Sequence, residues 1–228
     1  MKNDTKDFQE PTFNQLDPVF KHIYDRVKDY TLTSGHRLYS LYNAVRYLDE
    51  QKIRGDFVEC GVYKGGSSML MALTTNYPNR KIWLYDTFEG MTEPCKYDVD
   101  LEGQKANEHM DEDWIQCIAP LDDVKRNMAK TTYPHNLLKF IKGDVVQTLY
   151  DEVPGKIALL RLDTDFYEST KVELEQLFPR LIFGGVLIID DYGHWKGSKK
   201  AVDEYFRKNN IKMLLHPMDY TGRIGLKI

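Results

Sequence analysis

The chain has 228 residues, of which 42% are hydrophobic and 29% charged, a composition that suits one large folded domain. Its formal net charge of −4 argues against a nucleic-acid-binding protein, which would carry a basic surface. The longest apolar runs are far shorter than a membrane span, and the polar first residues provide no apolar core for a signal peptide. Three widely spaced cysteines without a metal-ligand pattern favour a reducing, cytoplasmic setting.

Residues 1–54 are predicted to form an N-terminal arm followed by two helices. The first residues, up to about position 17, are polar and lack periodicity, as expected of a loose arm. A helix is predicted from Asp17 to about Tyr30, because the proline near its start suits a first helical turn. Ser34 is the expected N-cap of the next helix, in which apolar residues recur at helical spacing as far as Leu48.

From residue 55 onwards, short apolar runs alternate with amphipathic segments, which indicates βαβ units and a parallel sheet of the α/β class. The last two strands are joined by Pro217–Gly222, which is too short for a parallel crossover, so they should form an antiparallel hairpin. The predicted strands are Asp56–Gly61, Lys81–Asp86, Leu138–Asp144, Ile157–Asp163, Gly185–Asp191, Lys212–His216 and Arg223–Ile228. The predicted helices are Gly65–Thr75, Pro120–Thr131, Glu168–Leu181 and Ser198–Asn209.

The segment 92–135 is the outlier in this alternation. It is long, polar and rich in acids, and Trp114 lies among them. Connections of this length are typical of functional lids or mobile insertions. We therefore treat residues 55–228 as one domain that carries an insertion at 92–135.

Two apolar runs end abruptly in carboxylates, and this is the most informative pattern in the chain. One run precedes Asp163 and Asp165, and the next precedes Asp190 and Asp191. Because neighbouring parallel strands lie about 4.8 Å apart and end at the same edge, these acids are expected to converge on one hard cation such as Mg²⁺. We predict that Asp163, Asp190 and Asp191 bind the metal, and that Asp165 is the general base on a metal-acidified hydroxyl. The alternative is that Asp190 and Asp191 only cap the following loop.

The segment Val58–Ser68 lies where the first strand gives way to a helix, and glycines such as Gly61 permit close backbone approach to a ligand. Its spacing departs from the dinucleotide fingerprint Gly-x-Gly-x-x-Gly, and Glu59 would repel a phosphate. An acid there suits a cationic amine, with Ser67 and free backbone N–H groups nearby to hold a carboxylate. An amino-acid moiety carries both charges. A structural glycine turn with a solvated glutamate is an almost equal alternative.

Two further strands end in polar residues at the same predicted edge. Asp86, followed by Thr87, ends the second strand, where an acid commonly binds ribose hydroxyls. Gly143–Val145 ends the third strand, where the side chain of Asp144 can meet an adenine edge. Either pattern alone is typical of a strand-terminal turn, but three consecutive strands that end in acids indicate a ligand site.

The loop after Asp191 should lie over the same rim. His194 is a candidate second base or substrate contact and Trp195 a candidate stacking wall, and the alternative for His194 is an ordinary surface hydrogen-bonding group. Asp219–Arg223 in the closing hairpin can equally be an Asx-type turn, with Gly222 at positive φ, or a part of the site.

As an ordered set, motifs from about Tyr30 to the C-terminus resemble the macrocin O-methyltransferase (TylF/MycF) family. This family belongs to the S-adenosylmethionine-dependent class I methyltransferases and includes the novobiocin sugar methyltransferase. Known members methylate a hydroxyl of a deoxysugar on a macrolide or an aminocoumarin. The resemblance is carried by Thr31–Ser34, Asp56–Ser67, Asp86–Met91, Leu160–Thr170, Gly184–Trp195 and Tyr220–Arg223.

The resemblance implies a Rossmann-like methyltransferase fold with a mostly parallel seven-stranded sheet, S-adenosyl-L-methionine as cofactor, and Mg²⁺. It also implies that residues 1–54 cover the cofactor and substrate. Together with the patterns above, it predicts catalytic roles for Asp165 and His194 and metal ligands at Asp163, Asp190 and Asp191. The predicted cofactor contacts are Thr31, Ser34, Glu59, Gly61, Ser67, Asp86, Thr87, Gly143, Asp144, Val145 and Asp163.

The expected reaction is Mg²⁺-dependent methylation of a sugar hydroxyl, and a non-sugar vicinal diol is the alternative acceptor. A metal-dependent oxidoreductase or nucleotide-using transferase on a similar sheet is disfavoured by Glu59 and by the missing phosphate fingerprint. A non-catalytic, cofactor-binding descendant is disfavoured by the presence of all four aspartates. The expected partner is a small hydroxylated molecule, without nucleic acid or membrane. Oligomeric state stays open, and exchange of the polar arm between subunits is one route to a homo-oligomer.

Overall fold

The computed structural model describes residues 17–110 and 116–228, and in these residues seven strands form one sheet. The strand order is β3-β2-β1-β4-β5-β7-β6. The first five strands are parallel, whereas β7 pairs antiparallel with β5 and with β6. The predicted mostly parallel sheet with a C-terminal hairpin is therefore confirmed. The strands are β1 (Asp56–Cys60), β2 (Ile82–Asp86), β3 (Leu138–Lys142), β4 (Ile157–Leu162), β5 (Leu181–Ile189), β6 (His216–Pro217) and β7 (Arg223–Leu226).

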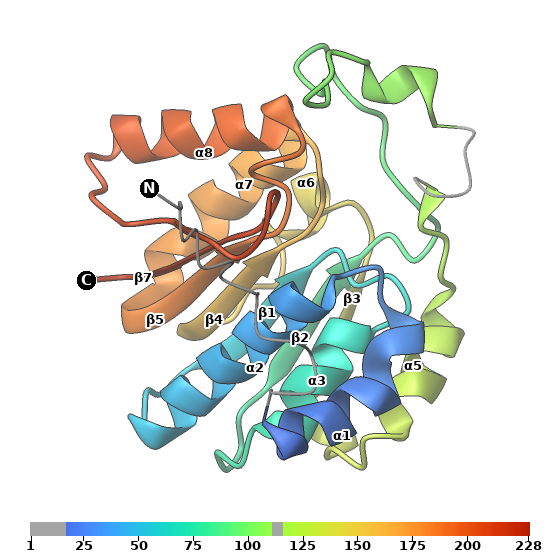
Figure 1. Ribbon diagram of the computed structural model, residues 1–228, viewed down its shortest axis with the longest axis vertical. Helices are drawn as coiled ribbons and strands as arrows, with labels where there is room; N and C mark the ends of the chain where they lie inside the picture. Colours follow the sequence, from blue (N-terminus) through green and yellow to red (C-terminus); the bar gives the residue numbers. More distant parts are fainter. Residues whose placement is uncertain (1–16, 111–115) are drawn as a thin grey trace, which may run out of the picture.

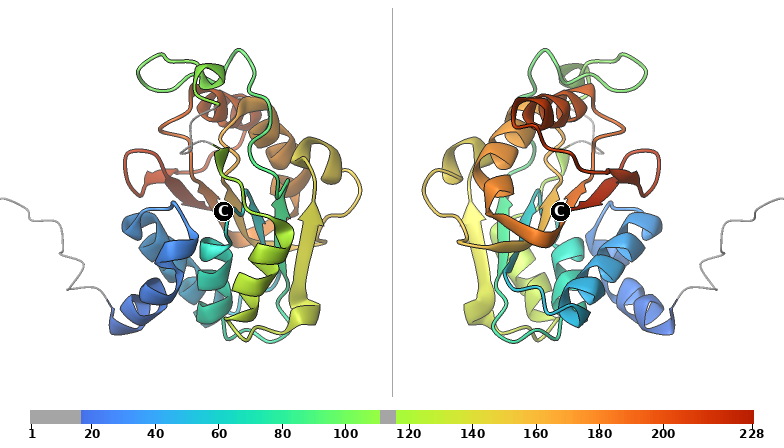
Figure 2. Two further views of the ribbon diagram at one scale, coloured as in Figure 1. Left: turned by 90° about the vertical axis from the view of Figure 1, so that its right-hand side faces the viewer. Right: turned by 90° about the vertical axis from the view of Figure 1, so that its left-hand side faces the viewer.

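Helices cover both faces of the sheet and complete a three-layer sandwich (Figures 1 and 2). On one face lie α1, α2, α3 and α5, and on the other lie α6, α7 and α8. In the described part of the chain, no helix is long and apolar enough to cross a membrane. The bounds are α1 (Pro18–Val27), α2 (Gly35–Glu50), α3 (Gly66–Thr74), α5 (Leu121–Ala129), α6 (Val145–Thr148), α7 (Tyr167–Leu177) and α8 (Lys196–Lys208).

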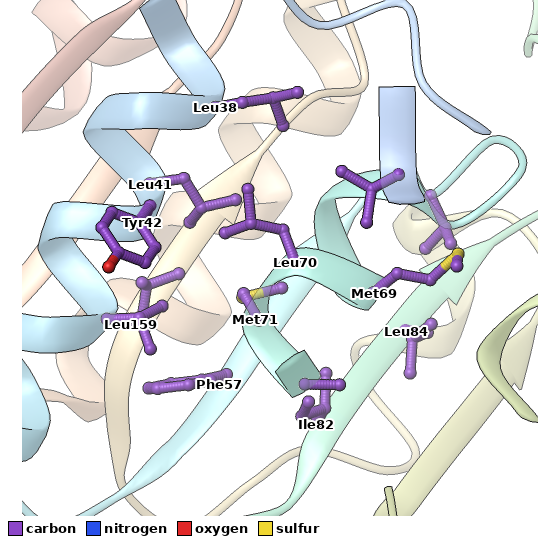
Figure 3. Close-up of a cluster of buried hydrophobic side chains, with 14 of the residues drawn as sticks. Leu38, Leu41, Tyr42, Phe57, Met69, Leu70, Met71, Ile82, Leu84 and Leu159 are labelled. Atoms are coloured by element: carbon purple, nitrogen blue, oxygen red, sulfur yellow. The ribbon is translucent and has the colours of Figure 1, made fainter. Parts of the chain in front are cut away.

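Apolar side chains fill the space on both sides of the sheet. Every residue of β4 is buried, which explains its continuous apolar run, because a strand under helices on both faces has no solvent-facing side. Successive side chains point to opposite faces, so Phe57 and Val58 of β1 belong to different core clusters. Burial of each such side chain contributes roughly 1.5–3 kcal/mol. Figure 3 shows the α2–α3 side, with Leu38, Leu41, Tyr42, Phe57, Met69, Leu70, Met71, Ile82, Leu84 and Leu159.

The helices near the site begin where their caps predict. Ser34 is the N-cap of α2, and its hydroxyl accepts a hydrogen bond from the backbone N–H of Arg37 at 3.3 Å. Asp17 caps α1 in the same way, by accepting from the N–H of Val19 at 2.8 Å. These local signals are sufficient to set both helix starts, because an N-cap satisfies donors that the helix itself leaves unpaired.

Several predicted boundaries are corrected. The helix expected to reach Leu181 ends at Leu177, because Pro179 lies in a short 3₁₀ turn from which β5 begins four residues earlier than predicted. The edge strand expected at Lys212–His216 is only the pair His216–Pro217. Proline cannot donate to a ladder and is confined to sheet edges, which limits this strand.

Between β2 and β3 the insertion contains more structure than a loop. Its helix α5 confirms the prediction over Pro120–Thr131, and a 3₁₀ turn, Ala106–Glu108, precedes it. The backbone is also bridged between Val99 and Lys105. The predicted N-terminal arm, residues 1–16, and positions 111–115 with Trp114 lie outside the described residues.

Candidate active site

A cavity of about 220 Å³ opens at the carboxyl edge of the sheet, above the ends of β1, β2, β4 and β5. A smaller cavity of about 50 Å³ adjoins it above β2, β3 and β4. This is the edge at which open α/β sheets bind their ligands. Both cavities are lined by Gly61, Asp86, Gly90, Met91 and Asp163.

Three carboxylates gather in the larger cavity: Asp163, Asp165 and Asp191. One oxygen of each lies within 4.8 Å of the others, and the N–H of Asp165 donates to Oδ2 of Asp191 at 3.3 Å. Burial and the neighbouring carboxylates raise the pKa of Asp163 and Asp191, and raise that of Asp165 to about 7. A hard divalent cation would relieve this repulsion and prefers oxygen ligands, so the donor set fits the predicted Mg²⁺.

Asp190 does not belong to this acid group. Its Oδ1 accepts a hydrogen bond from Arg161 at 2.7 Å, and its Oδ2 forms an ion pair with Arg37. Both oxygens therefore face guanidinium groups, and the acid group contains the predicted base Asp165 together with the predicted ligands Asp163 and Asp191. The role of Asp190 as a metal ligand stays a prediction, because Asp190 lines the same cavity and the predicted ligand Asp163 also accepts a hydrogen bond from Arg161.

Arg161 is the buried centre of the site, and sequence reasoning did not identify it. Only 2% of its side chain is exposed, and its guanidinium also donates to Glu59 at 2.7 Å, Asp163 at 2.6 Å and Thr33 at 2.8 Å. A single arginine inside an apolar strand was the available signal, because a charge buried at such a position requires carboxylate partners.

Glu59 is fully buried and is not on the wall of either cavity. It lies beside Arg161 in the register of β1 and β4, and its other oxygen accepts from the hydroxyl of Ser68. This carboxylate therefore neutralises an internal arginine, and its predicted contact with a cofactor amine stays a prediction. Ser67 and Gly61, predicted with it, do line the larger cavity.

Gly61 and Asp86 shape the loop that follows β1. A Cβ on Gly61, whose φ is +81°, would lie 1.8 Å from the carbonyl oxygen of Asp163, so only glycine lets the two strand ends approach this closely. Asp86 accepts from the N–H groups of Val62 at 2.6 Å and Tyr63 at 3.0 Å. One carboxylate thus holds the loop in place while it borders both cavities.

The smaller cavity contains the residues predicted for ribose and adenine contacts. Thr87 and Gly143–Val145 line it together with Asp86. Asp144 also has a structural role that was not predicted, because its carboxylate caps the short helix α6 by accepting from the N–H of Val146 at 2.9 Å. The two adjoining cavities therefore extend from the glycine loop after β1 to the end of β3.

The segment before α2 reaches over the larger cavity. Thr31, Leu32 and Thr33 line it, whereas Ser34 lies outside the wall and donates to Asp219 at 2.9 Å. Asp219 forms the expected Asx turn, accepting from the N–H groups of Thr221 and Gly222. The predicted positive φ at Gly222 is wrong. Glycine is needed there for close packing, since a Cβ would lie 2.9 Å from the Cδ atom of the Arg37 side chain.

His194 and Trp195 line the cavity as predicted. Burial lowers the pKa of His194, so its imidazole is neutral at pH 7. Its ring packs edge-on against Trp195, with centroids 4.9 Å apart, and Trp195 in turn packs on Phe166 at 5.6 Å. Trp195 is 3% exposed, so it is a packed wall of the cavity.

Comparison with known proteins identifies this arrangement. The family model of macrocin-O-methyltransferase (TylF) matches residues 24–224. The chain is 34% identical to 8-demethyl-8-(2,3-dimethoxy-alpha-L-rhamnosyl)-tetracenomycin-C 4'-O-methyltransferase of Streptomyces olivaceus, over 85% of this chain and 74% of that protein. It is 30% identical to demethyldecarbamoylnovobiocin O-methyltransferase of Streptomyces niveus, with the same coverage.

A solved structure shows the same fold. The O-methyltransferase NovP superposes with a TM-score of 0.76 at 28% identity, covering 87% of this chain and 82% of that one. The sheet order and the position of the cavity agree with the predicted Rossmann-like class I methyltransferase fold. The chain therefore belongs to the macrocin-O-methyltransferase family and is an O-methyltransferase.

Proposed function

We propose that this protein transfers a methyl group from S-adenosyl-L-methionine to a hydroxyl of a sugar, with Mg²⁺ bound at the acid group. The observation that carries the proposal is the group Asp163, Asp165 and Asp191 beside a glycine-loop cavity at the carboxyl edge of the sheet. The tetracenomycin relative supports the acceptor class, because its name specifies methylation of a rhamnosyl compound.

The cofactors would occupy adjoining parts of the site. Ser67 and the loop at Gly61 would contact the methionine part, Asp86 and Thr87 the ribose, and Gly143–Val145 the adenine. When bound, S-adenosylmethionine supplies an electrophilic methyl on sulfur, and Mg²⁺ lowers the pKa of a coordinated hydroxyl. We assign Asp163 and Asp191 as metal ligands.

Asp165 would act as the general base and accept the proton of the acceptor hydroxyl on its carboxylate. Its φ is +65°, a left-handed conformation that is uncommon for a residue with a side chain and typical of functional sites. The surrounding cavity would align acceptor and donor, a contribution of up to roughly 7–11 kcal/mol in well-oriented reactions.

The cover of the cavity would position the acceptor and exclude water. Thr31–Thr33 and Met91 border the space above the acid group, and Trp195 closes one wall. Neutral His194 can donate one hydrogen bond and accept another, which suits contact with a sugar hydroxyl. The wide spacing of Cys60, Cys95 and Cys117 favours the reducing cytoplasm as the setting of this chemistry.

Asp165→Asn tests the proposal directly. Methyl transfer to a panel of rhamnosides, with a catechol as a non-sugar diol, is followed with labelled S-adenosylmethionine. We expect kcat to fall by about 10²- to 10⁴-fold, because the amide cannot take the proton, while the Kd for S-adenosylhomocysteine stays unchanged. Activity should disappear in EDTA and return with Mg²⁺. Wild-type protein that fails to bind S-adenosylhomocysteine in calorimetry would refute the proposal, and activity on the catechol alone would refute the sugar acceptor.

A further inference from the structure

Asp98 lies in the insertion and is outside the set of residues used above. It is 1% exposed, and its carboxylate accepts two backbone hydrogen bonds. Oδ2 accepts from the N–H of Cys95 at 2.6 Å, within the insertion, and Oδ1 accepts from the N–H of Tyr167 at 2.7 Å, outside the insertion. A buried acid that reaches 69 residues along the chain to one backbone N–H has a specific partner rather than a solvent-facing role.

That partner is the first residue of α7, and α8 begins beside it. The N-cap residues of these helices, Phe166 and Trp195, provide no side-chain hydrogen bond to the helix. Asp98 also touches the start of α8, because a Cβ on Gly197 would lie 1.9 Å from its Oδ1. The carbonyl of the next residue, Val99, accepts from the N–H of Lys196 at 2.8 Å. One short segment of the insertion thus satisfies the N-termini of two helices, where a carboxylate is favoured.

The residues just before these two helices carry the proposed chemistry. Asp165 and Phe166 precede α7, and His194 and Trp195 precede α8. The rings of Phe166 and Trp195 meet edge-on, and buried Ala106 of the insertion packs with both. Figure 1 shows the insertion, in green, beside the ends of α7 and α8. The insertion, both helix starts and both site loops therefore meet at Asp98.

We propose that Asp98 is a positioning residue that keeps Asp165 and His194 aligned, because its carboxylate caps α7 and packs against the start of α8. The inference rests on the proposed function of Asp165 and adds a residue that touches neither cofactor nor acceptor. Without the carboxylate, the first turn of α7 loses its acceptor and the start of α8 loses a packing contact, and the positive-φ backbone at Asp165 loses one of its supports. Asp98 is not among the residues that line the smaller cavity, where Thr87 and Gly143–Val145 would contact the cofactor, so this cavity should keep its shape.

Asp98→Ala and Gly197→Ala test the proposal from its two sides. The first removes the cap, and the second leaves Asp98 in the chain but fills the space that its Oδ1 occupies. We expect both to lower kcat by up to about 100-fold and to leave the Kd for S-adenosylhomocysteine unchanged, because small misplacements of a reacting group are costly. The double variant should lose little more than either single one. Asp98→Asn keeps one acceptor oxygen and should retain more activity than Asp98→Ala.

Glu102→Ala is the matched control, because it removes an exposed acid from the same insertion. Hydrogen exchange provides a readout that does not depend on catalysis. The amide of Tyr167, whose acceptor is the Asp98 carboxylate, should exchange faster in Asp98→Ala and Gly197→Ala than in wild type or Glu102→Ala. This result would stand even if the wild-type protein had no methyltransferase activity, so it separates the cap from the proposed function. Unchanged exchange at the Tyr167 amide, or equal loss of S-adenosylhomocysteine affinity and kcat, would overturn the proposal.

Discussion

At the scale of single residues, ion pairs with two arginines distinguish the adjacent aspartates of the site. Arg37 and Arg161 occupy both oxygens of Asp190, whereas Asp191 stays with the acid group. Neighbouring aspartates in the sequence thus face different partners. Substitutions can therefore test whether Asp190 and Asp191 have different roles.

Asp191→Asn and Asp190→Asn should separate metal binding from arginine pairing. Loss of Asp191 removes a proposed ligand, so we expect the Kd for Mg²⁺ to rise at least about tenfold in a calorimetric titration. Loss of the charge on Asp190 leaves Arg37 and Arg161 with one carboxylate fewer, so the free energy of unfolding should fall by about 3–5 kcal/mol. Equal weakening of Mg²⁺ binding in both variants would instead return Asp190 to the ligand set.

Glu173 on α7 predicts a pH-dependent stability. It is fully buried and accepts from the hydroxyl of Thr164 at 2.9 Å, and burial raises its pKa from 4.5 to about 8. Between these values the unfolded chain releases this proton and the folded chain keeps it. The group therefore lowers the free energy of unfolding as pH rises, by at most about 1.4 kcal/mol per pH unit.

Glu173→Gln should remove this slope while keeping an acceptor for Thr164. Denaturant unfolding of both proteins at several pH values from about 5 to 8 measures it. We expect the variant to gain stability relative to wild type towards the alkaline end. Parallel profiles for the two proteins would show that Glu173 titrates normally.

At the scale of elements, the site exists because the ends of β1 and β4 come unusually close. A Cβ on Gly61 would lie 1.8 Å from the carbonyl oxygen of Asp163. Gly61→Ala must separate these strand ends and adopt a positive φ, so we expect it to lower the free energy of unfolding by at least about 2 kcal/mol and to weaken S-adenosylhomocysteine binding. Gly155→Ala, with no atom within 4 Å of its Cβ, is the control and should stay within about 0.5 kcal/mol of wild type. A Gly61→Ala protein as stable as this control contradicts the close approach.

The elements also show which boundaries local sequence can determine. Ser34 caps α2 as predicted, and α1 begins next to Pro18 as predicted, because these signals depend only on the next few residues. The start of β5 and the length of β6 were misplaced, because a strand end depends on its pairing partner as well as on its own residues.

At the scale of the whole molecule, the site draws on distant parts of the chain, so its ligands should stabilise the entire fold. Arg37 of α2 meets Asp190 after β5 and Asp219 of the closing hairpin. Mg²⁺ at about 100 times its Kd would add about 2.7 kcal/mol to the free energy of unfolding. Each added kcal/mol raises the Tm of a chain of this size by roughly 2–4 °C. Thermal unfolding with MgCl₂ or with EDTA measures the shift. Asp191→Asn should show a much smaller one, and an equal shift in both proteins would place the metal elsewhere.

The sequence by itself determined the fold class, the edge of the sheet that holds the site, and most of its polar residues. These predictions came from apolar runs that end in acids at Asp86, Asp163 and Asp191. Such runs are typical of buried parallel strands, and the residues that follow them lie at the ligand-binding edge of the sheet. Only the tertiary structure decided that Asp190 pairs with Arg37 and Arg161, that Glu59 pairs with Arg161, and that Asp98 caps α7. Such pairings join residues up to 153 positions apart in the sequence. The order of charged residues along the chain does not determine which of them come within hydrogen-bond distance in the folded protein.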